Sequence, residues 1–433
     1  MIVFSYIFLI MNDESNRIRE NRTLEFKEDL TNTFLKTVSA FSNYDGGIIL
    51  FGVNDCGIPV GLGNPKQTCL DIENKINDSI HPQPDYSLKI DGQNKTVELK
   101  VNAGKSKPYT YKSKAYKRND TATIEVDELE FSRLVLQGKN IRFEQLSSEN
   151  QNLKFSVLEE KLIQKIGIDR LDKNILKTLN LFSDSDGFNH AAELLSDSND
   201  FPGIDIAKFG ESISVIQKRA TFEHESILKE LSEAVNVYKD FYQYEEINGI
   251  ERKKIERIPE NAFRETLANA LIHRTWDVNA QIRILMFDDR IEITSPGGLS
   301  SGISEEEYLK GNVSILRNPI IGNVFYRLHI VEILGTGIPR INEAYRNSAK
   351  KPRFEIFENS IKVTLPVTDV MDLTKDEKTV LAVLSKNIPR QISGISASVP
   401  FGKSKLTELL KSLESKNYIT IQGNGRGTKY CKN

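Results

Sequence analysis

The stretch that decides the fold is IPENAFRETLANALIH, residues 258–273. It predicts a helix that opens with Pro259 at its first position, where a missing N–H is harmless. On a 3.6-residue repeat the apolar side chains line one face, and Glu265, Asn269 and His273 form a separate polar stripe. An acid and an amide one turn apart suit a metal–nucleotide site, because the amide oxygen can ligate Mg²⁺ and the carboxylate can orient water.

Two glycine-rich turns follow this helix in the sequence. They are SPGGL at 295–299 and GTGIPRI at 335–341. Turns of this composition present bare backbone N–H groups to phosphates. Each turn alone is a weak signal, since isolated glycine motifs match many unrelated proteins by chance. The stronger observation is that both turns follow the predicted helix in order.

The order of these motifs over residues 258–345 resembles a known ATP-binding fold. E-x-x-x-N-A-x-x-H-R, a strand hairpin, S-P-G-G-L, R-N-P and G-T-G-I follow one another as in the GHKL-type α/β sandwich of gyrase, histidine kinases and MutL. The similarity is greatest to the carboxy-terminal part of RecG-like proteins. It implies ATP with Mg²⁺ as cofactor, Glu265 as the general base of a weak ATPase and Asn269 as the metal ligand. The nucleotide contacts that it implies are Asn269, His273, Gly297, Gly298, Arg317, Asn318, Gly335, Thr336 and Gly337.

The sequence departs from the wider family at one point. The family usually holds adenine through an acid in a D-x-G-x-G turn, whereas Ser295 and Pro296 stand in that region here. One alternative hypothesis is therefore a scaffold, in which the ATP-binding-like domain has lost its ligand and only mediates assembly.

A second resemblance covers residues 20–135, which alternate short strands and helices. The blocks L-E-F-K, A-F-S-N-Y-D-G-G, F-G-V-N-D-C-G and V-G-L are similar to the AlbA-like domain of the Schlafen superfamily. The resemblance implies an α+β domain that binds nucleic acid. Within it, the pattern predicts a helix near 66–80 and then a β-hairpin across SLKIDGQNKTVELKV.

Basic residues and tyrosines are interleaved within the segment 105–118. Lysines give salt-dependent affinity for phosphates, and tyrosines can stack on exposed bases. The alternative is a surface strand whose tyrosines face the core. The predicted contacts with DNA, or alternatively with RNA, are Lys105, Lys107, Tyr109, Lys112, Lys114, Lys117 and Arg118.

Some Schlafen-type domains are nucleases that use two glutamates on one segment and an aspartate from a later one. Glu20, Glu25 and Asp55 have the matching residue types and order. Three convergent carboxylates can hold a divalent cation that activates water, so a metal-dependent nuclease is the second alternative function. The competing carboxylates are Glu28, Asp29 and Asp45.

The pattern of predicted elements changes from residue 370 onward. Helix, helix, longer helix and glycine-tipped hairpin is the order typical of a winged helix-turn-helix. The alternative is an interaction module with an ordinary solvated charged helix. We expect the DNA contacts to be Lys403, Lys405, Thr407 and Lys411 on the long helix and Arg426 and Lys429 on the hairpin.

Composition limits the classes of function. The 58 basic and 60 acidic residues give a net charge of −2, so any nucleic-acid site must be local. The three cysteines have no metal-ligand spacing, which favours a reducing cytoplasm. The apolar run MIVFSYIFLIM at the amino terminus is too short to span a bilayer, which predicts no membrane partner. We interpret residues 1–10 as read from an upstream start codon; the alternative is an added edge strand.

A P-loop helicase is nearly excluded by two incomplete motifs. G-K-S occurs at 104–106 and 402–404, but Leu99 and Ala397 stand where the P-loop requires its first glycine.

The sequence as a whole predicts an α+β multidomain protein. The expected parts are a lead-in (1–19), an AlbA-like domain (20–135), a helical connector (136–257), a GHKL-type ATP-binding-like domain (258–369) and a winged helix (370–433). The predicted function is a cytoplasmic DNA-binding regulator of transcription, with an ATP-dependent switch or dimerisation domain that allows a homo-oligomer.

Overall fold

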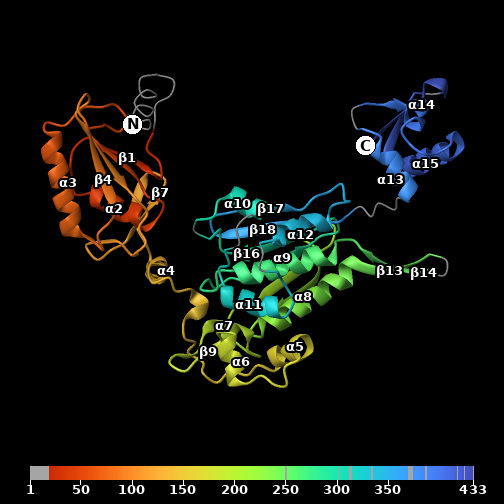
Figure 1. Cartoon of the computed structure of the whole chain (residues 1–433), viewed down its shortest axis with the longest axis horizontal. Coiled ribbons are helices and arrows are strands. Elements are labelled where there is room, and N and C mark those ends of the chain that lie inside the picture. Colours follow the sequence, from red (N-terminus) through yellow and green to blue (C-terminus); the bar gives the residue numbers. More distant parts are fainter. Residues whose placement is uncertain are drawn as a thin grey trace. The chain divides into compact units, whose positions relative to one another are not determined.

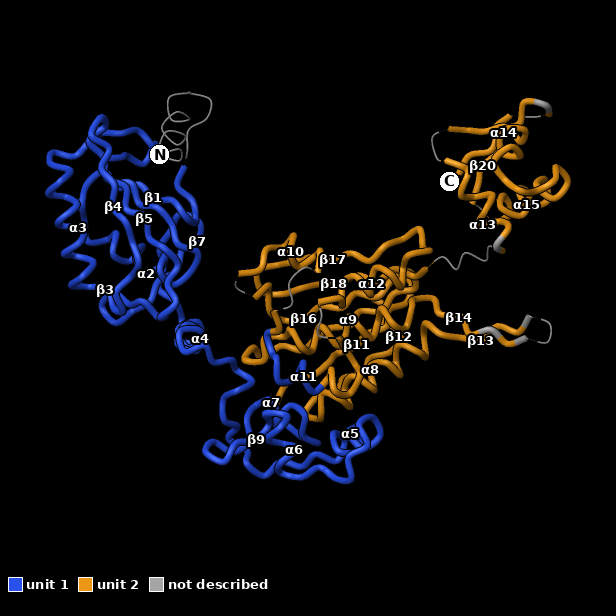
Figure 2. Tube along the Cα trace, in the orientation of Figure 1, with its two compact units in different colours: residues 1–199, 317–324 blue, residues 200–316, 325–433 orange. Residues whose placement is uncertain are grey.

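The fold is mixed α+β and multidomain, and the chain divides into two compact units (Figure 2). One unit comprises residues 1–199 with 317–324, and the other comprises 200–316 with 325–433. The computed structural model describes residues 19–248, 251–300, 302–311, 315–332, 335–368, 374–385, 388–416, 418–423 and 425–432. The interpretation of residues 1–10 therefore lies outside the described residues.

The amino-terminal domain is built on a four-stranded sheet in which only the first pair is parallel. In spatial order its strands are β1 (Leu24–Lys27), β2 (Gly47–Phe51), β5 (Thr96–Val101) and β4 (Tyr86–Asp91). The predicted helix near 66–80 is confirmed as α3 (Pro65–Ser79), and the predicted hairpin is confirmed as β4–β5. The remaining elements are α2 (Phe34–Asn43), β3 (Ile80–His81), β6 (Thr110–Tyr111), β7 (Tyr116–Asn119), β8 (Ala122–Glu125) and α4 (Glu128–Gly138).

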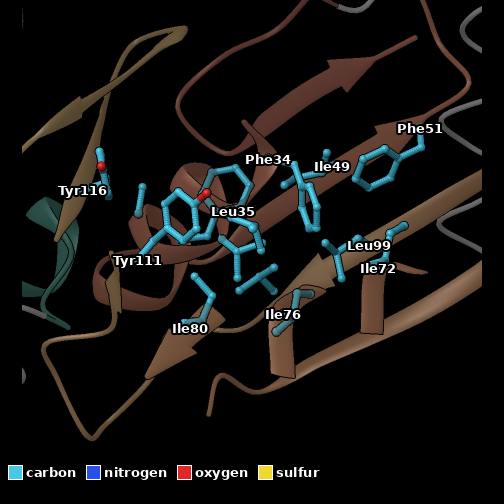
Figure 3. Packing of buried hydrophobic residues seen from close by; sticks show 14 of the residues in the cluster. Phe34, Leu35, Ile49, Phe51, Ile72, Ile76, Ile80, Leu99, Tyr111 and Tyr116 are labelled. Carbon is cyan, nitrogen blue, oxygen red and sulfur yellow. The ribbon is translucent and has the colours of Figure 1, made fainter. Parts of the chain in front are cut away.

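Apolar side chains of α2, α3 and the sheet pack into one core (Figure 3). Phe34 and Phe51 meet edge to face, with ring centroids 5.4 Å apart. Helix α2 buries nearly all of its ten residues, so it is the central element of this domain.

Short elements follow in residues 139–199. They are η1 (Phe143–Gln145), α5 (Ser156–Ile166), α6 (Lys173–Thr178), β9 (Phe182–Ser183), β10 (Gly187–Phe188) and α7 (His190–Leu195).

A six-stranded sheet forms the body of the second unit. Its strands, in spatial order, are β12 (Ile216–Phe222), β11 (Ile204–Phe209), β15 (Ile282–Met286), β16 (Arg290–Pro296), β18 (Ser360–Pro366) and β17 (Arg353–Ile356). Strands β11 and β12 lie before residue 258, within the predicted connector. The connector is therefore not wholly helical. Its segment SVIQKRATF (214–222) predicts a strand beside the next domain, which β12 confirms, whereas β11 is not predicted.

A layer of helices packs against this sheet (Figure 1). It contains α8 (Ile227–Tyr242), α9 (Glu260–His273) and α12 (Gly337–Ala344). Period-2 alternation explains the contact, since β16 buries Ile291 and Ile293 while Arg290 and Glu292 alternate with them. Helix α9 confirms the predicted helix, but Pro259 is its N-cap rather than its first residue. The other elements are the hairpin β13 (Gln243–Asn248) and β14 (Glu251–Glu256), with α10 (Glu305–Lys310) and α11 (Pro319–Arg327).

The described residues of the carboxy-terminal part form three α-helices and a three-stranded sheet of order β19-β21-β20. Leu406, Leu410 and Leu413 of the longest helix are buried, as the helical pattern of this segment predicts. The elements are α13 (Lys375–Ala382), β19 (Arg390–Gln391), α14 (Ile392–Ser396), α15 (Lys403–Ser415), β20 (Ile419–Gln422), η2 (Gly425–Gly427) and β21 (Lys429–Lys432).

Candidate functional site

Glu265 and Asn269 lie one turn apart on α9, and the GTGI turn closes against both. Asn269 Nδ2 donates to Glu265 Oε1 at 3.4 Å. A Cβ atom placed on Gly337 would lie 2.6 Å from Asn269 Nδ2 and 2.9 Å from Glu265 Oε1, so a larger residue there would displace these two side chains. Two motifs that are about 70 residues apart in the sequence therefore meet at one point.

Glu265 is 8% exposed and sits among charged neighbours. Burial raises the pKa of its carboxyl group, while the Arg340 guanidinium and the Asn269 amide partly offset that rise. Arg340 also forms an ion pair with Glu332 at 3.4 Å. Arg340 belongs to the GTGIPRI motif, although the motif alone gave it no role. Its position one turn after Gly337 on α12 is the signal that could have placed it near Glu265.

A pocket lies between α9 and the sheet, beside the Glu265–Asn269 pair. Of the predicted residues, Asn269, His273 and Gly297 line it. Its volume of about 40 Å³ holds only a few water-sized groups in this structure, since one water needs about 10–15 Å³. The full lining is Thr266, Asn269, Ala270, His273, Ile293, Ser295, Gly297, Tyr308, Ile338, Ile341, Phe354, Ile361 and Val363.

The glycines of both turns have structural reasons for their identity. Gly297 has a φ of +108°, and a Cβ atom there would lie 2.1 Å from Thr275 Oγ1. A Cβ atom on Gly298 would lie 2.2 Å from the Glu358 carbonyl oxygen. Gly335 has a φ of +71°. Beside it, Thr336 Oγ1 is buried and has no hydrogen-bond partner in the described part of the chain, as a hydroxyl that awaits a ligand would be.

Arg317 and Asn318 precede α11 and do not line the pocket. Two N–H groups at the start of α11 already have a carboxyl partner, because Glu144 Oε1 accepts from Ile320 N at 2.7 Å and Glu144 Oε2 accepts from Ile321 N at 3.0 Å. Within its own compact unit, the R-N-P motif is therefore followed by a helix end that Glu144 caps. Glu144 itself comes from the connector, where no motif in the sequence indicated a function.

The interleaved tyrosines of the segment 105–118 are core residues. Tyr109, Tyr111 and Tyr116 are 5–7% exposed, and Figure 3 shows Tyr111 within the packed cluster and Tyr116 at its margin. Tyr109 N donates to Asn43 Oδ1 at 2.7 Å. The prediction that Tyr109 contacts bases is wrong, because the alternative of a strand with core-facing tyrosines holds.

The basic residues of this segment are mostly neutralised. Lys114 pairs with Glu125 at 2.7 Å and Lys117 with Glu130 at 2.6 Å. Burial lowers the pKa of the Lys107 ammonium group. Arg118 is 8% exposed and donates to Glu25, so it does not face a ligand. The other two predicted contacts, Lys105 and Lys112, are exposed, and neither forms an ion pair with an acidic side chain among the described residues.

The nuclease carboxylates are occupied by other contacts. Glu20 Oε1 accepts from Phe26 N at 2.7 Å. Glu25 pairs with Lys27 at 2.5 Å and with Arg118 at 3.2 Å. Asp55 is exposed in a turn that is held instead by the Asn54 side chain. No group of three metal-ligating side chains occurs in the residues that the structure describes.

In the carboxy-terminal module, Lys403, Lys411 and Lys429 are exposed. Lys405 pairs with Asp376 and lies over the Phe401 ring, while the Thr407 hydroxyl donates to the Lys403 carbonyl. The Arg426 side chain lies outside the described residues. Within the described ranges, no helix has the length and apolar character needed to cross a membrane.

Comparisons with known proteins agree with both resemblances. No curated protein matches the sequence. The DIP2311 protein of Corynebacterium diphtheriae is 18% identical over 100% of this chain and 96% of its own, with a TM-score of 0.48. The amino-terminal domain of a putative ATP-dependent DNA helicase RecG-related protein from Nitrosomonas europaea is 25% identical over 30% of this chain and 92% of its own, with a TM-score of 0.21. Residues 20–127 match the family "Schlafen, AlbA_2", and residues 279–365 match "Putative ATP-dependent DNA helicase recG C-terminal". This chain therefore contains a Schlafen AlbA_2 domain and a domain of the recG carboxy-terminal family.

Proposed function

We propose that this protein is a cytoplasmic DNA-binding regulator, acting on transcription, whose conformation responds to Mg²⁺–ATP. The observation that carries the nucleotide site is the close approach of Gly337 to both Glu265 and Asn269. The sheet with its helical layer supports a GHKL-type sandwich. That domain is also the candidate for dimerisation.

Asn269, Glu265 and Thr336 have different roles in the proposed nucleotide site. Because Asn269 Nδ2 donates to Glu265, the amide oxygen Oδ1 is left for a cation. Glu265 can orient a water molecule, and Thr336 can donate its unpaired hydroxyl to a phosphate. Bound Mg²⁺ would neutralise phosphate charge.

The carboxy-terminal module supports DNA binding. Its element order of α13, β19, α14, α15, β20 and β21 supports a winged helix. Lys403 and Lys411 on α15 and Lys429 on β21 are exposed and can reach phosphates or base edges. Lys105 and Lys112 of the AlbA_2 domain add a weaker, sequence-independent contact.

Nucleotide binding is tested by the shift in thermal stability of the full chain with Mg²⁺–ATP. A ligand at 100 times its dissociation constant adds about 2.7 kcal/mol to the stability. Asn269→Ala should remove this shift, because the phosphates lose their metal. The matched control is Asn261→Ala, an exposed amide on the same helix. If ATP, ADP and GTP all leave the wild-type melting temperature unchanged, the domain has only a structural role.

A further inference from the structure

Strand β12 is an edge of the six-stranded sheet, and one of its two sides pairs with no strand in the described part of the chain. Ile213 and Val215 in the turn before it are 72% and 51% exposed, and its first residue, Ile216, is 56% exposed. Lys218 and Arg219 farther along the strand are exposed as well. An open edge is a template for pairing with another strand, and charged residues on it limit which strands can pair.

The hairpin β13–β14 has a second open strand edge. Among the described residues, β13 pairs only with β14, and Figure 2 shows the hairpin extending from its compact unit. The hairpin is held at its base, where Gln243 donates to Glu260 of α9 at 2.7 Å. Tyr244 and Ile247 are 52% and 69% exposed. An isolated two-stranded hairpin is only marginally stable in water, so a third strand on its open edge would stabilise it.

The two open edges match each other better than either matches itself. Ile213 before β12 and Ile247 on β13 are the two most exposed large apolar side chains among the residues that the structure describes. The charges of the edges are opposite, since β12 carries Lys218 and Arg219 whereas β13 carries the acidic pair 245–246. Opposite charges on neighbouring strands stabilise the pairing, and like charges destabilise it. Each strand therefore disfavours a second copy of itself and favours the other strand.

The ion pairs that these charged side chains already form do not prevent such a contact. Each of them lies at the surface, with at least one partner more than half exposed. Surface ion pairs contribute at most about 1 kcal/mol, so an exchange of partners costs little. The pairs are Lys218 with Asp240, Arg219 with Asp205, and Glu245 with Arg252.

We propose that β12 of one copy pairs with β13 of a second copy, so that the chain forms a two-fold dimer with two identical strand contacts. In a two-fold interface the contacts are reciprocal, and β13 of the first copy meets β12 of the second. Backbone hydrogen bonds of the added strand supply affinity, while the apolar and charged side chains select the partner. The inference rests on the dimerisation proposed above for the ATP-binding-like domain and names its surface.

The test measures the mass of the full chain by sedimentation, without nucleotide or DNA. The wild type should sediment with the mass of two chains. Glu245→Lys with Glu246→Lys makes the β13 edge basic, and Lys218→Glu with Arg219→Glu makes the β12 edge acidic, so each double variant should be a monomer. An equimolar mixture of the two double variants should dimerise again, because both contacts of the mixed dimer then join opposite charges.

The matched control reverses another exposed acidic pair of the same compact unit. Glu305→Lys with Glu306→Lys on α10 should leave the dimer intact. A monomeric wild type, or a dimer that both double variants preserve, overturns the proposal. Double variants that stay monomeric when they are mixed overturn it too, whether from misfolding or from a different interface. None of these failures touches the nucleotide site, because its thermal shift is measured independently of the mass.

Discussion

Glu144 closes the amino-terminal end of α11 by accepting the Ile320 N–H at 2.7 Å, from 176 residues earlier in the chain. The carboxyl group is fully buried, and its second oxygen accepts from Ile321 N. A helix end needs partners for its first N–H groups and attracts negative charge. Here the Glu144 carboxyl group accepts hydrogen bonds from two of these N–H groups, next to the R-N-P motif for which the sequence suggested nucleotide contacts.

This contact predicts a pH-dependent stability. Burial raises the pKa of Glu144 from its ordinary 4.5 to about 7, against the opposing effect of the Ile320 and Ile321 N–H groups. The folded state therefore favours the protonated form, so the contribution is full below pH 4.5 and is lost as the pH rises through about 7. The loss is about 3 kcal/mol. Denaturant unfolding from pH 5 to 8 should show Glu144→Gln less stable than the wild type at pH 5, with the gap narrowing toward pH 8. The exposed control Glu149→Gln should track the wild type, and a gap that stays constant with pH would contradict the prediction.

Gly337→Ala should weaken nucleotide binding with little effect on folding elsewhere. The added methyl group would lie 2.6 Å from Asn269 Nδ2 and would push that amide away from its metal position. We expect Mg²⁺–ATP affinity to fall by about tenfold or more, which corresponds to about 1.4 kcal/mol. Calorimetry provides the measurement. Gly394→Ala is the control, because a Cβ atom there meets nothing within 4 Å. Unchanged affinity in Gly337→Ala would remove the GTGI turn from the site.

Tyr308→Ala should speed nucleotide entry. A pocket of about 40 Å³ admits a purine only if one wall moves. Helix α10, which carries Tyr308, is the weakest wall, since none of its six residues is fully buried. Stopped-flow association of a fluorescent ATP analogue should be faster in Tyr308→Ala. Tyr308→Phe should behave as the wild type, because burial raises the pKa of Tyr308 to about 12 and its hydroxyl stays protonated. Slower association in the alanine variant would show that Tyr308 holds the ligand instead.

Lys403→Ala combined with Lys411→Ala should weaken DNA binding and flatten its salt dependence. Both lysines are exposed on α15, and the removal of one phosphate contact lowers the slope of log K against log salt by about 0.9. We expect the slope to fall by about 2 for the pair. Lys405→Ala is the matched control on the same helix, since its ion pair with Asp376 already offsets its charge. Fluorescence anisotropy at several salt concentrations gives the slopes, and equal slopes in all variants would place DNA elsewhere.

Arg118→Ala should destabilise the AlbA_2 domain rather than reduce nucleic-acid binding directly. Removing Arg118 takes one of two ion-pair partners from the buried Glu25, whose other partner is Lys27, and costs about 1–3 kcal/mol. Chemical denaturation measures this destabilisation, with the exposed Arg22→Ala as control. The same pairing predicts no Mn²⁺-dependent cleavage of RNA or single-stranded DNA by the wild type. Cleavage that disappears in Glu25→Gln would revive the nuclease alternative.

How far the sequence predicts this structure depends on how local each signal is. Helix α9 and the hairpin β4–β5 follow from period-3.6 and period-2 patterns that lie within one segment. The pairing of β11 with β15 is parallel and joins residues about 78 positions apart, so no local pattern reveals it. For this reason the sequence alone predicts a strand over residues 214–222, where β12 lies, but not β11.

The candidate site likewise contains parts that local motifs predict and parts that depend on tertiary contacts. The polar stripe of α9 and the GTGI turn come from local motifs, and their meeting is visible in the structure. The role of the tyrosines in the segment 105–118 depends on which side of a short strand faces the core. Only the position of α2, whose Ser39 and Asn43 bond the Tyr109 carbonyl, settles that question. Glu144 carries no motif, so its role depends wholly on tertiary contact.

The placement of β11 has a consequence for how this protein can be inherited and recombined. Strand β11 lies between β12 and β15 inside the sheet, so one sheet draws its strands from residue 204 to residue 366. The family match begins only at residue 279, after both β11 and the helix that carries Glu265 and Asn269. A gene fusion that transferred only the matched segment would deliver a sheet without an inner strand and a site without its acid and amide. A gene segment that transfers the whole sheet must therefore span residues 204–366, which is nearly twice the length of the family match at 279–365.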